Sequence, residues 1–292
     1  MVPSQTPHGC RVRSLIRPLR RSQRRLGALV ASRGFHRGRL SSVLREADDV
    51  APEVTLLCVY RARNVANVLS MCRADDEGNV SPRLWCLDGL VPSSLAPWTV
   101  GNGPGLRPAL LNRLVTNAPS SSWIVVCDDD VRFGGRQDSV VDLVRTCEAL
   151  DLDLAQPAHA WRSYFSHAMT VAHCLSIVRL TRFVEIGPLF VASPAATAAI
   201  FPLNEDLGMG LGQDLIWSRF LSSTLRMGIL DAYQIRHLGP IAASYSVDHQ
   251  LLASLTEDAG GLRSVMATTA RWWVWQPRRS MRPGQPFARR AG

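Results

Sequence analysis

Acidic residues are absent from both ends of this chain, since the first is Glu46 and the last is Asp258. Residues 1–45 hold 11 arginines and residues 259–292 hold 7, which leaves 15 arginines against all 24 acidic residues and a net charge of −9 in between. The overall charge of +9 therefore belongs to the ends. Because a domain that binds nucleic-acid phosphates is itself expected to be basic, nucleic acid is excluded as the main substrate.

Lysine is also absent, and all 33 basic residues are arginine. We attribute this to the coding bias of a GC-rich genome. The seven cysteines include no C-x-x-C pair, so we expect neither a zinc cluster nor a disulfide framework. This usage favours a reducing compartment and a cytoplasmic location.

Long apolar runs are missing too. The longest uncharged stretch, Ile186–Leu203, contains three prolines, and no transmembrane span is predicted. The arginine-rich start lacks the apolar core of a secretory signal, and although it resembles a transit peptide, a disordered tail is the favoured interpretation. The basic ends leave open a peripheral contact with a membrane.

Length and composition predict one large α/β domain rather than two small ones, because 292 residues with 46% hydrophobic and 20% charged residues can bury a substantial core. We expect a disordered Arg-rich tail at 1–50, the domain at 51–258, and a Trp- and Arg-rich extension at 259–292. The extension contains Trp272-Trp273-Val274-Trp275, for which core packing is favoured over stacking on a sugar or insertion into a membrane interface.

The first half of the domain alternates predicted strands and helices. Apolar runs predict strands at 54–60, 83–87 and 123–127, and apolar residues at helical spacing predict helices at 64–74 and 107–117. This order is that of a doubly wound parallel sheet, in which ligands bind beyond the carboxyl ends of the strands.

The second half is less regular. We expect a helix at 139–150, a strand at 183–192 followed by the helix-capping pair Ser193-Pro194, a helix at 213–222 and a strand at 228–237. Residues 154–180 carry no clear period beyond possible strand segments.

Three consecutive carboxylates, Asp128, Asp129 and Asp130, follow the predicted strand at 123–127. Carboxylates so close repel one another unless a cation or hydrogen-bond donors offset their charge, which favours a divalent metal site. The alternative is a solvated turn.

The sequence around this triplet resembles a known fold family. Residues 105–112 (GLRPALLN) and 123–130 (WIVVCDDD) resemble the Gly…Arg/Asn helix and the D-x-D strand of GT-A glycosyltransferases. Residues 154–157, 183–190, 208–214 and 235–237 are similar to later blocks of an uncharacterised plant and bacterial branch with that fold. The resemblance covers about 54–240, in motif order more than in identity.

The resemblance implies a GT-A (Rossmann-like), mainly parallel sheet flanked by helices, and a metal-dependent, hexosyltransferase-like enzyme that uses a nucleotide-diphosphate sugar. Asp128 and Asp130 would hold Mn²⁺ or Mg²⁺, and His237 would complete the metal shell. Asp214, in a motif where Gln213 replaces the usual Glu, would be the general base that deprotonates an acceptor hydroxyl and so favours inversion. The alternative for Asp214 is an acid that only stabilises a helix N-terminus.

Donor recognition is expected at the other strand ends. Arg61 and Asn64 follow the first predicted strand and Asp88 follows the second, where this fold contacts the base and ribose. Arg107 would pair with the pyrophosphate, and Asp129 would contact the donor beside the metal. Each of these side chains could equally be a solvated cap.

Four further side chains are candidates for sugar contacts. Glu185 could bind either sugar, and His159, His167 and His173 could touch the acceptor.

Three other functions are weighed against the transferase. A phosphatase-like hydrolase is disfavoured, because its paired aspartates close the first strand and need a lysine. A sugar nucleotidylyltransferase shares the sheet but opens with a Gly-rich, Lys-containing loop, whereas residues 59–64 have no glycine. A non-catalytic nucleotide-sugar-binding module of the same fold remains open. The donor, the acceptor, the choice between inversion and retention, and the oligomeric state do not follow from the sequence.

Overall fold

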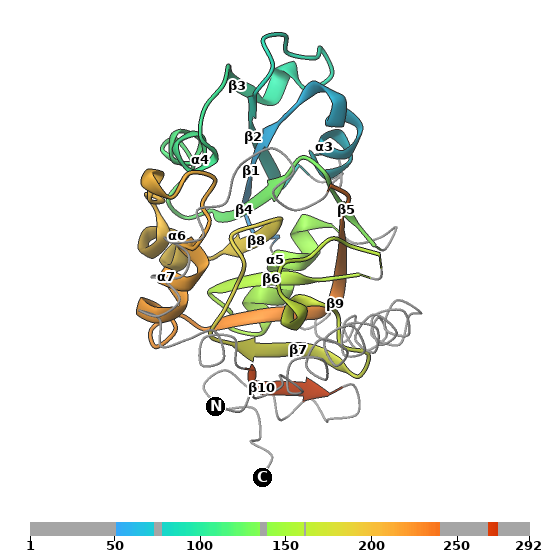
Figure 1. The fold of residues 1–292 in the computed structure, drawn as a ribbon, viewed down its shortest axis with the longest axis vertical. Helices are drawn as coiled ribbons and strands as arrows, with labels where there is room; N and C mark the ends of the chain where they lie inside the picture. The colour runs from blue at the N-terminus through green and yellow to red at the C-terminus, as the bar shows by residue number, and fades with distance from the viewer. Residues whose placement is uncertain (1–50, 73–77, 135–138, 161, 240–267, 274–292) are drawn as a thin grey trace, which may run out of the picture.

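A computed structural model describes residues 51–72, 78–134, 139–160, 162–239 and 268–273. The predicted tail at 1–50 and most of the predicted extension lie outside these residues. The described strands form one ten-stranded sheet in the order β10-β7-β9-β6-β8-β4-β1-β2-β3, with β5 paired to β9 (Figure 1).

One half of the sheet is parallel. Its strands are β1 (Val54–Tyr60), β2 (Val80–Cys86), β3 (Thr99–Asn102) and β4 (Trp123–Asp128). β1 lies between β2 and β4 and pairs in parallel with both. The three apolar runs are confirmed as strands, because a parallel sheet covered on both faces needs such runs. β3 lies between the predicted strand at 83–87 and the predicted helix at 107–117, where no helix or strand is predicted from the sequence.

The other half mixes both directions. Its strands are β5 (Val131–Phe133), β6 (Leu154–His159), β7 (Ser176–Thr181), β8 (Leu189–Ala192), β9 (Met227–His237) and β10 (Thr268–Trp273). β8 pairs antiparallel with both β4 and β6, and thereby joins the two halves. The predicted strand at 183–192 is confirmed only from Leu189 onward, and the segment without a clear period contains β6 and β7.

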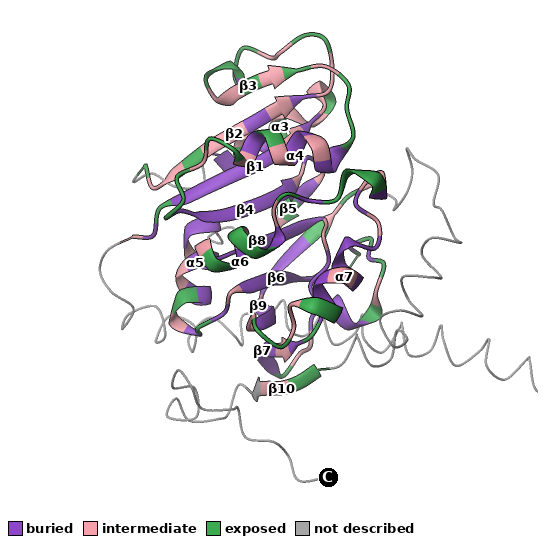
Figure 2. Ribbon diagram, turned by 90° about the vertical axis from the view of Figure 1, so that its left-hand side faces the viewer, coloured by how far each residue is buried: buried purple, intermediate pink, exposed green. Residues whose placement is uncertain are grey.

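Helices cover both faces of the sheet. They are α3 (Val65–Cys72), α4 (Arg107–Val115), α5 (Val140–Ala149), α6 (Pro194–Ile200) and α7 (Gln213–Phe220). α3 and α5 share one core cluster with Leu56 and Cys58 of β1, whereas α4, α6 and α7 share another with Leu57. Alternate residues of one strand therefore enter cores on opposite faces. The central strands are buried along most of their length (Figure 2).

Serine caps begin two of these helices, as expected for residues 139–150 and for Ser193-Pro194. The Ser139 hydroxyl accepts from the Asp142 N–H at 3.1 Å, and the Ser193 hydroxyl accepts from the Ala196 N–H at 3.1 Å. Within the described residues, no helix has the length and apolar character that a membrane crossing requires.

Candidate functional site

The carboxyl ends of β1, β2 and β4 meet at one edge of the sheet, because the three strands run in parallel. This edge brings together the side chains that follow them. The Arg61 N–H donates to Asp129 Oδ2 at 2.7 Å, and the Ala62 N–H donates to Asp88 Oδ2 at 2.5 Å. The structure thus brings Arg61, Asp88 and Asp129 together at this edge, and their predicted contact with a donor stays a prediction.

Asp129 accepts hydrogen bonds from other residues of the protein. Its carboxylate accepts from the Arg61 N–H and the Asn64 side chain, and its main-chain oxygen accepts from Asn67 Nδ2 at 3.2 Å. Burial raises the pKa of Asp129 despite these donors. Asp129 and Asp88 thus hold the turn after β1, which gives both a structural role beside the predicted donor contact.

Asp128 forms an ion pair with Arg107, the first residue of α4. Arg107 Nε and Nη2 both lie 2.9 Å from Asp128 Oδ1, and Nη2 also donates to the Ile186 carbonyl at 3.1 Å. Arg107 is buried, so its cation sits against Asp128 and a main-chain oxygen in a region of low dielectric. An anion beside Asp128 would meet this guanidinium.

Asp130 pairs with His237, at the end of β9. His237 Nε2 lies 3.2 Å from Asp130 Oδ1. For Asp130 burial is the largest effect and opposes ionisation, but the hydrogen bond and charge of His237 outweigh it and lower the pKa of the carboxyl. Burial acts against the charged form of His237 too, yet Asp130, with weaker effects from Asp128 and Glu185, raises its pKa.

The residues predicted to bind a metal fit one in kind. Two carboxylates and an imidazole are suitable ligands for Mn²⁺, and a glycine lies against each carboxylate. A Cβ on Gly187 would lie 3.1 Å from Asp128 Oδ2, and one on Gly239 would lie 2.2 Å from Asp130 Oδ2. The structure joins Asp130 to His237 but pairs Asp128 with Arg107, and within the described ranges no three acidic, His or Cys side chains stand in a ready-made metal-binding group.

Asp214 lies in the first turn of α7 and is buried. Its carboxylate accepts from the Leu215 N–H at 2.9 Å and from the Ile186 main chain. Burial, together with the negative charge of Glu185, raises the pKa of Asp214 to about 7. A carboxyl with such a pKa accepts a proton near neutral pH far more readily than an exposed aspartate does.

A buried polar cluster behind Asp214 was only partly foreseen. His159 Nε2 lies 3.1 Å from Glu185 Oε2, and His159 Nδ1 lies 2.8 Å from the Ser163 hydroxyl. The Glu185 N–H donates to Gln156 Oε1 at 2.6 Å. Glu185 and His159 were candidates for sugar contacts, whereas Gln156 and Ser163 were missed.

An irregularity in β6 explains why Gln156 was missed. Residues three apart in a regular strand point to opposite faces. The pairing of β6 with β9 shifts register between Pro157 and Ala158, and Gln156 and His159 both reach Glu185. Pro157 inside the strand was the available signal, because proline removes a ladder hydrogen bond and marks bulges.

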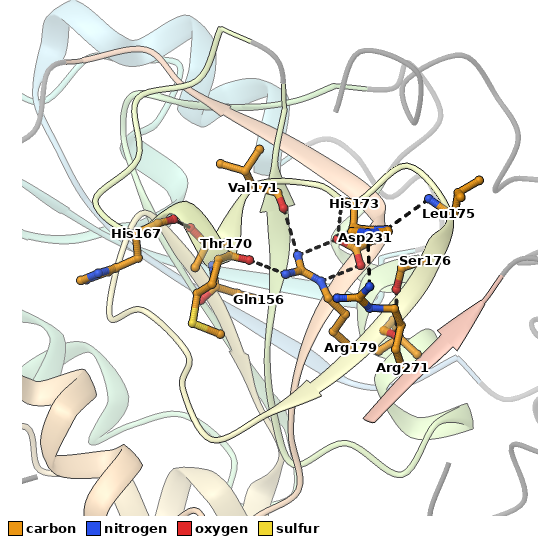
Figure 3. Close-up of polar contacts among 12 residues, drawn as sticks. Gln156, His167, Thr170, Val171, His173, Leu175, Ser176, Arg179, Asp231 and Arg271 are labelled. Carbon is orange, nitrogen blue, oxygen red and sulfur yellow. Dashed lines mark hydrogen bonds and ion pairs between the residues drawn. The ribbon is translucent and has the colours of Figure 1, made fainter. Parts of the chain in front are cut away.

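A second buried pair holds the connection between β6 and β7. Arg179 Nε donates to Asp231 Oδ2 at 2.8 Å and Nη2 donates to Oδ1 at 2.7 Å. The same guanidinium donates to the carbonyls of Met169 and Val171 (Figure 3). This connection carries His167, whose ring packs edge-on against Phe183 with centroids 4.9 Å apart and whose pKa is lowered by burial.

His173 lies away from the cluster around Glu185. Its N–H donates to Asp231 at 2.9 Å and its Nε2 lies 3.2 Å from Arg271 Nη1, so it joins the β6–β7 connection to β10 (Figure 3). The acceptor contact expected of His159, His167 and His173 stays a prediction, and the three side chains do not lie in one cluster.

Comparison with known proteins gives structural likeness only. The sequence matches no protein-family model and no curated protein. The structure is similar to GalNAc-T7 solved with UDP, GalNAc and Mn²⁺, with a TM-score of 0.53 and 8% identity over 72% of this chain, which spans 48% of that protein. It also aligns with the mannosyltransferase PcManGT from Pyrobaculum calidifontis in complex with GDP-Man and Mn²⁺, with a TM-score of 0.48 and 14% identity over 77% of this chain and 69% of that one.

At these identities the likeness concerns the fold alone, and it agrees with the topology described above. The sheet of this chain has a parallel half joined through β8 to a mixed half, with helices on both faces. The chain therefore has the GT-A fold.

Proposed function

We propose that the protein is a glycosyltransferase that moves a sugar from a nucleotide-diphosphate donor to an acceptor hydroxyl. The observation that carries the proposal is the link between Asp214 and the strand-end cluster through Ile186. The Ile186 main chain bonds to Asp214, a buried carboxyl whose pKa is raised to about 7, and also to Arg107, which pairs with Asp128 at the carboxyl edge of the parallel strands. Ligands of such sheets bind at this edge.

In this proposal the diphosphate of the donor lies beside Arg107 and Asp128. A departing nucleoside diphosphate carries concentrated negative charge, and the buried Arg107 guanidinium is a fixed donor for it. A divalent ion would be held by Asp130 and His237, with Asp128 completing the set, and when bound it would neutralise charge on the leaving group. Asp88 and the turn at Arg61–Asn64 lie where the nucleoside would rest.

In this proposal the acceptor hydroxyl lies beside Asp214. As the hydroxyl oxygen attacks the anomeric carbon, its proton passes to the Asp214 carboxylate, and the bond from the sugar to the diphosphate oxygen breaks. One base on the acceptor side suits a single direct displacement, and hence inversion at the anomeric carbon. Segment 185–187 links Asp214 to Arg107, and the transferred sugar would cover this segment.

The first test measures donor binding. Isothermal titration of the full chain with UDP-, GDP- and dTDP-sugars, each with Mn²⁺, Mg²⁺ or no metal, is expected to show metal-dependent binding of one donor. Asp130→Asn is expected to abolish that dependence. Asp151→Asn makes the same chemical change at an exposed residue before β6, at the opposite end of the sheet, and should bind as wild type does. Failure of every donor to bind with either metal would refute the proposal.

Turnover separates the enzyme from a binding module. Asp214→Asn is expected to lower the transfer rate by ~10²- to 10⁴-fold, the usual contribution of a general base, with little change in donor affinity. The transfer rate is measured from the nucleoside diphosphate released by the donor that binds, and the donor affinity from its titration. If Asp214→Asn leaves the rate unchanged, Asp214 is not the base, and metal-dependent binding without any turnover would favour the non-catalytic module. Release of a sugar phosphate with formation of a nucleoside triphosphate from pyrophosphate would identify a nucleotidylyltransferase instead.

A further inference from the structure

Three consecutive residues connect the two sides of the site. Glu185 bonds to β6, Ile186 bonds through its main chain to both Asp214 and Arg107, and Gly187 lies against Asp128. No other described segment is bonded in this way to both the proposed base and the proposed diphosphate contact. A contact that holds residues 185–187 in place therefore also holds the distance between Asp214 and Arg107.

Glu185 is held at both its main chain and its side chain. Its N–H donates to Gln156 Oε1 at 2.6 Å, and its Oε2 accepts from Gln156 Nε2 at 3.4 Å and lies 3.1 Å from His159 Nε2. His159 is in turn held by the Ser163 hydroxyl at 2.8 Å. These partners offset the cost of burying the Glu185 carboxylate, which would be high without them.

The second carboxylate oxygen, Oε1, is buried and has no hydrogen-bond partner among the described residues. Buried polar atoms in native structures are nearly always satisfied, so an exception calls for an explanation. Burial opposes ionisation of Glu185, but the hydrogen bond and charge of His159, with weaker effects from His167 and Gln156, lower the pKa of this carboxyl and favour its charged form. The negative charge of Glu185 therefore affects the ionisable side chains near it, including Asp214.

The groups that face Glu185 come from four elements. They are His159 on β6, His167 on the connection between β6 and β7, Asp214 on α7 and His237 on β9. Three of them are imidazoles, which favour the ionised carboxylate, and Asp214 is the one acid. Apart from Glu185, the groups acting on Asp214 are main-chain N–H groups, from Ile186 and from the start of α7.

We propose, as an extension of the transferase assignment, that Glu185 is a positioning residue of the transfer reaction. Clamped by Gln156 and His159, it fixes the Ile186 main chain between Asp214 and Arg107, and its negative charge strengthens Asp214 as a base. Glu185 touches neither substrate in this role, since its side chain is buried behind the segment that the sugar would cover.

The physical reason concerns the working pH of a base. An exposed aspartate holds its proton too weakly to remove one from a hydroxyl efficiently, and efficiency rises as the proton affinity of the base approaches the working pH. A neighbouring negative charge in a region of low dielectric raises that affinity. Main-chain anchoring matters separately, because a misplacement of about 1 Å in a reacting group can cost about 10²-fold in rate.

Glu185→Gln tests the charge while retaining the shape. Gln can still accept from His159 and bond to Gln156, so the fold should survive, which thermal melting will verify. The acid limb of the pH profile of kcat/KM is expected to move to lower pH, and the rate at neutral pH to fall about tenfold while the donor KM is retained. Glu53→Gln, an exposed site preceding β1 at the opposite end of the sheet, is the matched control and should leave the profile unchanged.

His159→Gln is the second variant and keeps the test decisive if Glu185→Gln unfolds. Removing the imidazole takes away the main group that lowers the pKa of Glu185, so this carboxyl keeps its proton, and stays neutral, to higher pH. The profile should therefore move in the same direction as in Glu185→Gln, by less. Because both changes act through one charge, the double variant should move the profile no further than Glu185→Gln alone. Additive shifts would overturn the proposed coupling.

A readout without turnover separates this inference from the transferase assignment. ¹³C NMR of carboxyl-labelled aspartate in the full chain, without donor or acceptor, follows the titration of Asp214, whose signal is the one lost in Asp214→Asn. Glu185→Gln is expected to lower the midpoint of that titration by about 1 pH unit. An unchanged midpoint refutes the role of Glu185 even if transfer is observed, and a lowered midpoint in a protein that transfers no sugar supports the coupling while the transferase assignment fails.

Discussion

The two halves of the sheet bury different kinds of side chain. The interior of the parallel half, β1 to β4, is filled by aliphatic residues and cysteines, and away from the acidic carboxyl edge it contains a neutral buried contact between Thr55 and Ser122. The mixed half buries ionisable pairs, including Arg179 with Asp231 and His159 with Glu185. One half is thus stabilised mainly by apolar burial, whereas the other depends on charges that must each find a partner.

The largest stability effect should come from breaking a charged pair of the mixed half. Asp231→Ala is expected to lower the free energy of unfolding by ~3–5 kcal/mol, because it leaves the buried Arg179 without its carboxylate. Thr55→Val, which removes the neutral contact with Ser122 in the parallel half, should cost about 1 kcal/mol. Urea unfolding measures both. Equal losses would show that the two halves do not differ as described.

A control variant separates the charge from the packing. Arg179→Met combined with Asp231→Leu removes both charges, and should recover much of the stability lost in Asp231→Ala. If the double variant is as unstable as the single one, the carbonyl contacts of Arg179 with Met169 and Val171 matter more than the ion pair does.

A smaller, pH-dependent effect is expected at Asp214. Its pKa is raised from the ordinary 3.8 to about 7, so between these values the folded protein holds a proton that the unfolded chain has released. The wild-type free energy of unfolding therefore falls as pH rises through this window, and stays lower above it. Asp214→Asn abolishes this dependence.

Denaturation at two pH values checks the sign. Relative to wild type, Asp214→Asn should be more stable at pH 8 than at pH 4, by at least about 1 kcal/mol. Asp151→Asn changes an exposed aspartate and should show no such difference. A variant that gains stability equally at both pH values would contradict the raised pKa.

The smallest effects concern the two serine caps. Ser139→Ala and Ser193→Ala each remove one capping bond and should each lower the free energy of unfolding by about 1 kcal/mol. The Ser193 hydroxyl also lies 3.3 Å from Asp153 Oδ1, so its loss should be the larger of the two. Thermal or urea melts resolve the order, and a larger loss at Ser139 would contradict it.

The same difference explains what could be predicted from the sequence. Runs such as Val54–Tyr60 and Trp123–Cys127 predict buried parallel strands directly, and the position of Asp128–Asp130 at a strand end follows from them. β6 and β7 contain Gln156, His159 and Arg179 at buried positions, and hydrophobic periodicity cannot detect a strand whose buried residues are polar.

Pairwise contacts were the other limit. The pairs of Arg107 with Asp128 and of Asp130 with His237 link residues 21 and 107 positions apart, and no local pattern encodes which carboxylate meets which base. The metal set predicted from the resemblance therefore remains a proposal, with the pairing of Asp128 and Arg107 as the feature that the sequence did not indicate.

The pairing of β10 with β7 extends the sheet beyond residue 258. Thr268–Trp273, beyond the boundary predicted at residue 258, lies antiparallel on β7 and occupies its outer row of main-chain N–H and C=O groups. A protein shortened to residue 258 would expose that row as an open edge, which is a template for strand addition by another chain. Self-association of a shortened protein would then reflect the loss of its covering strand rather than a biological oligomer.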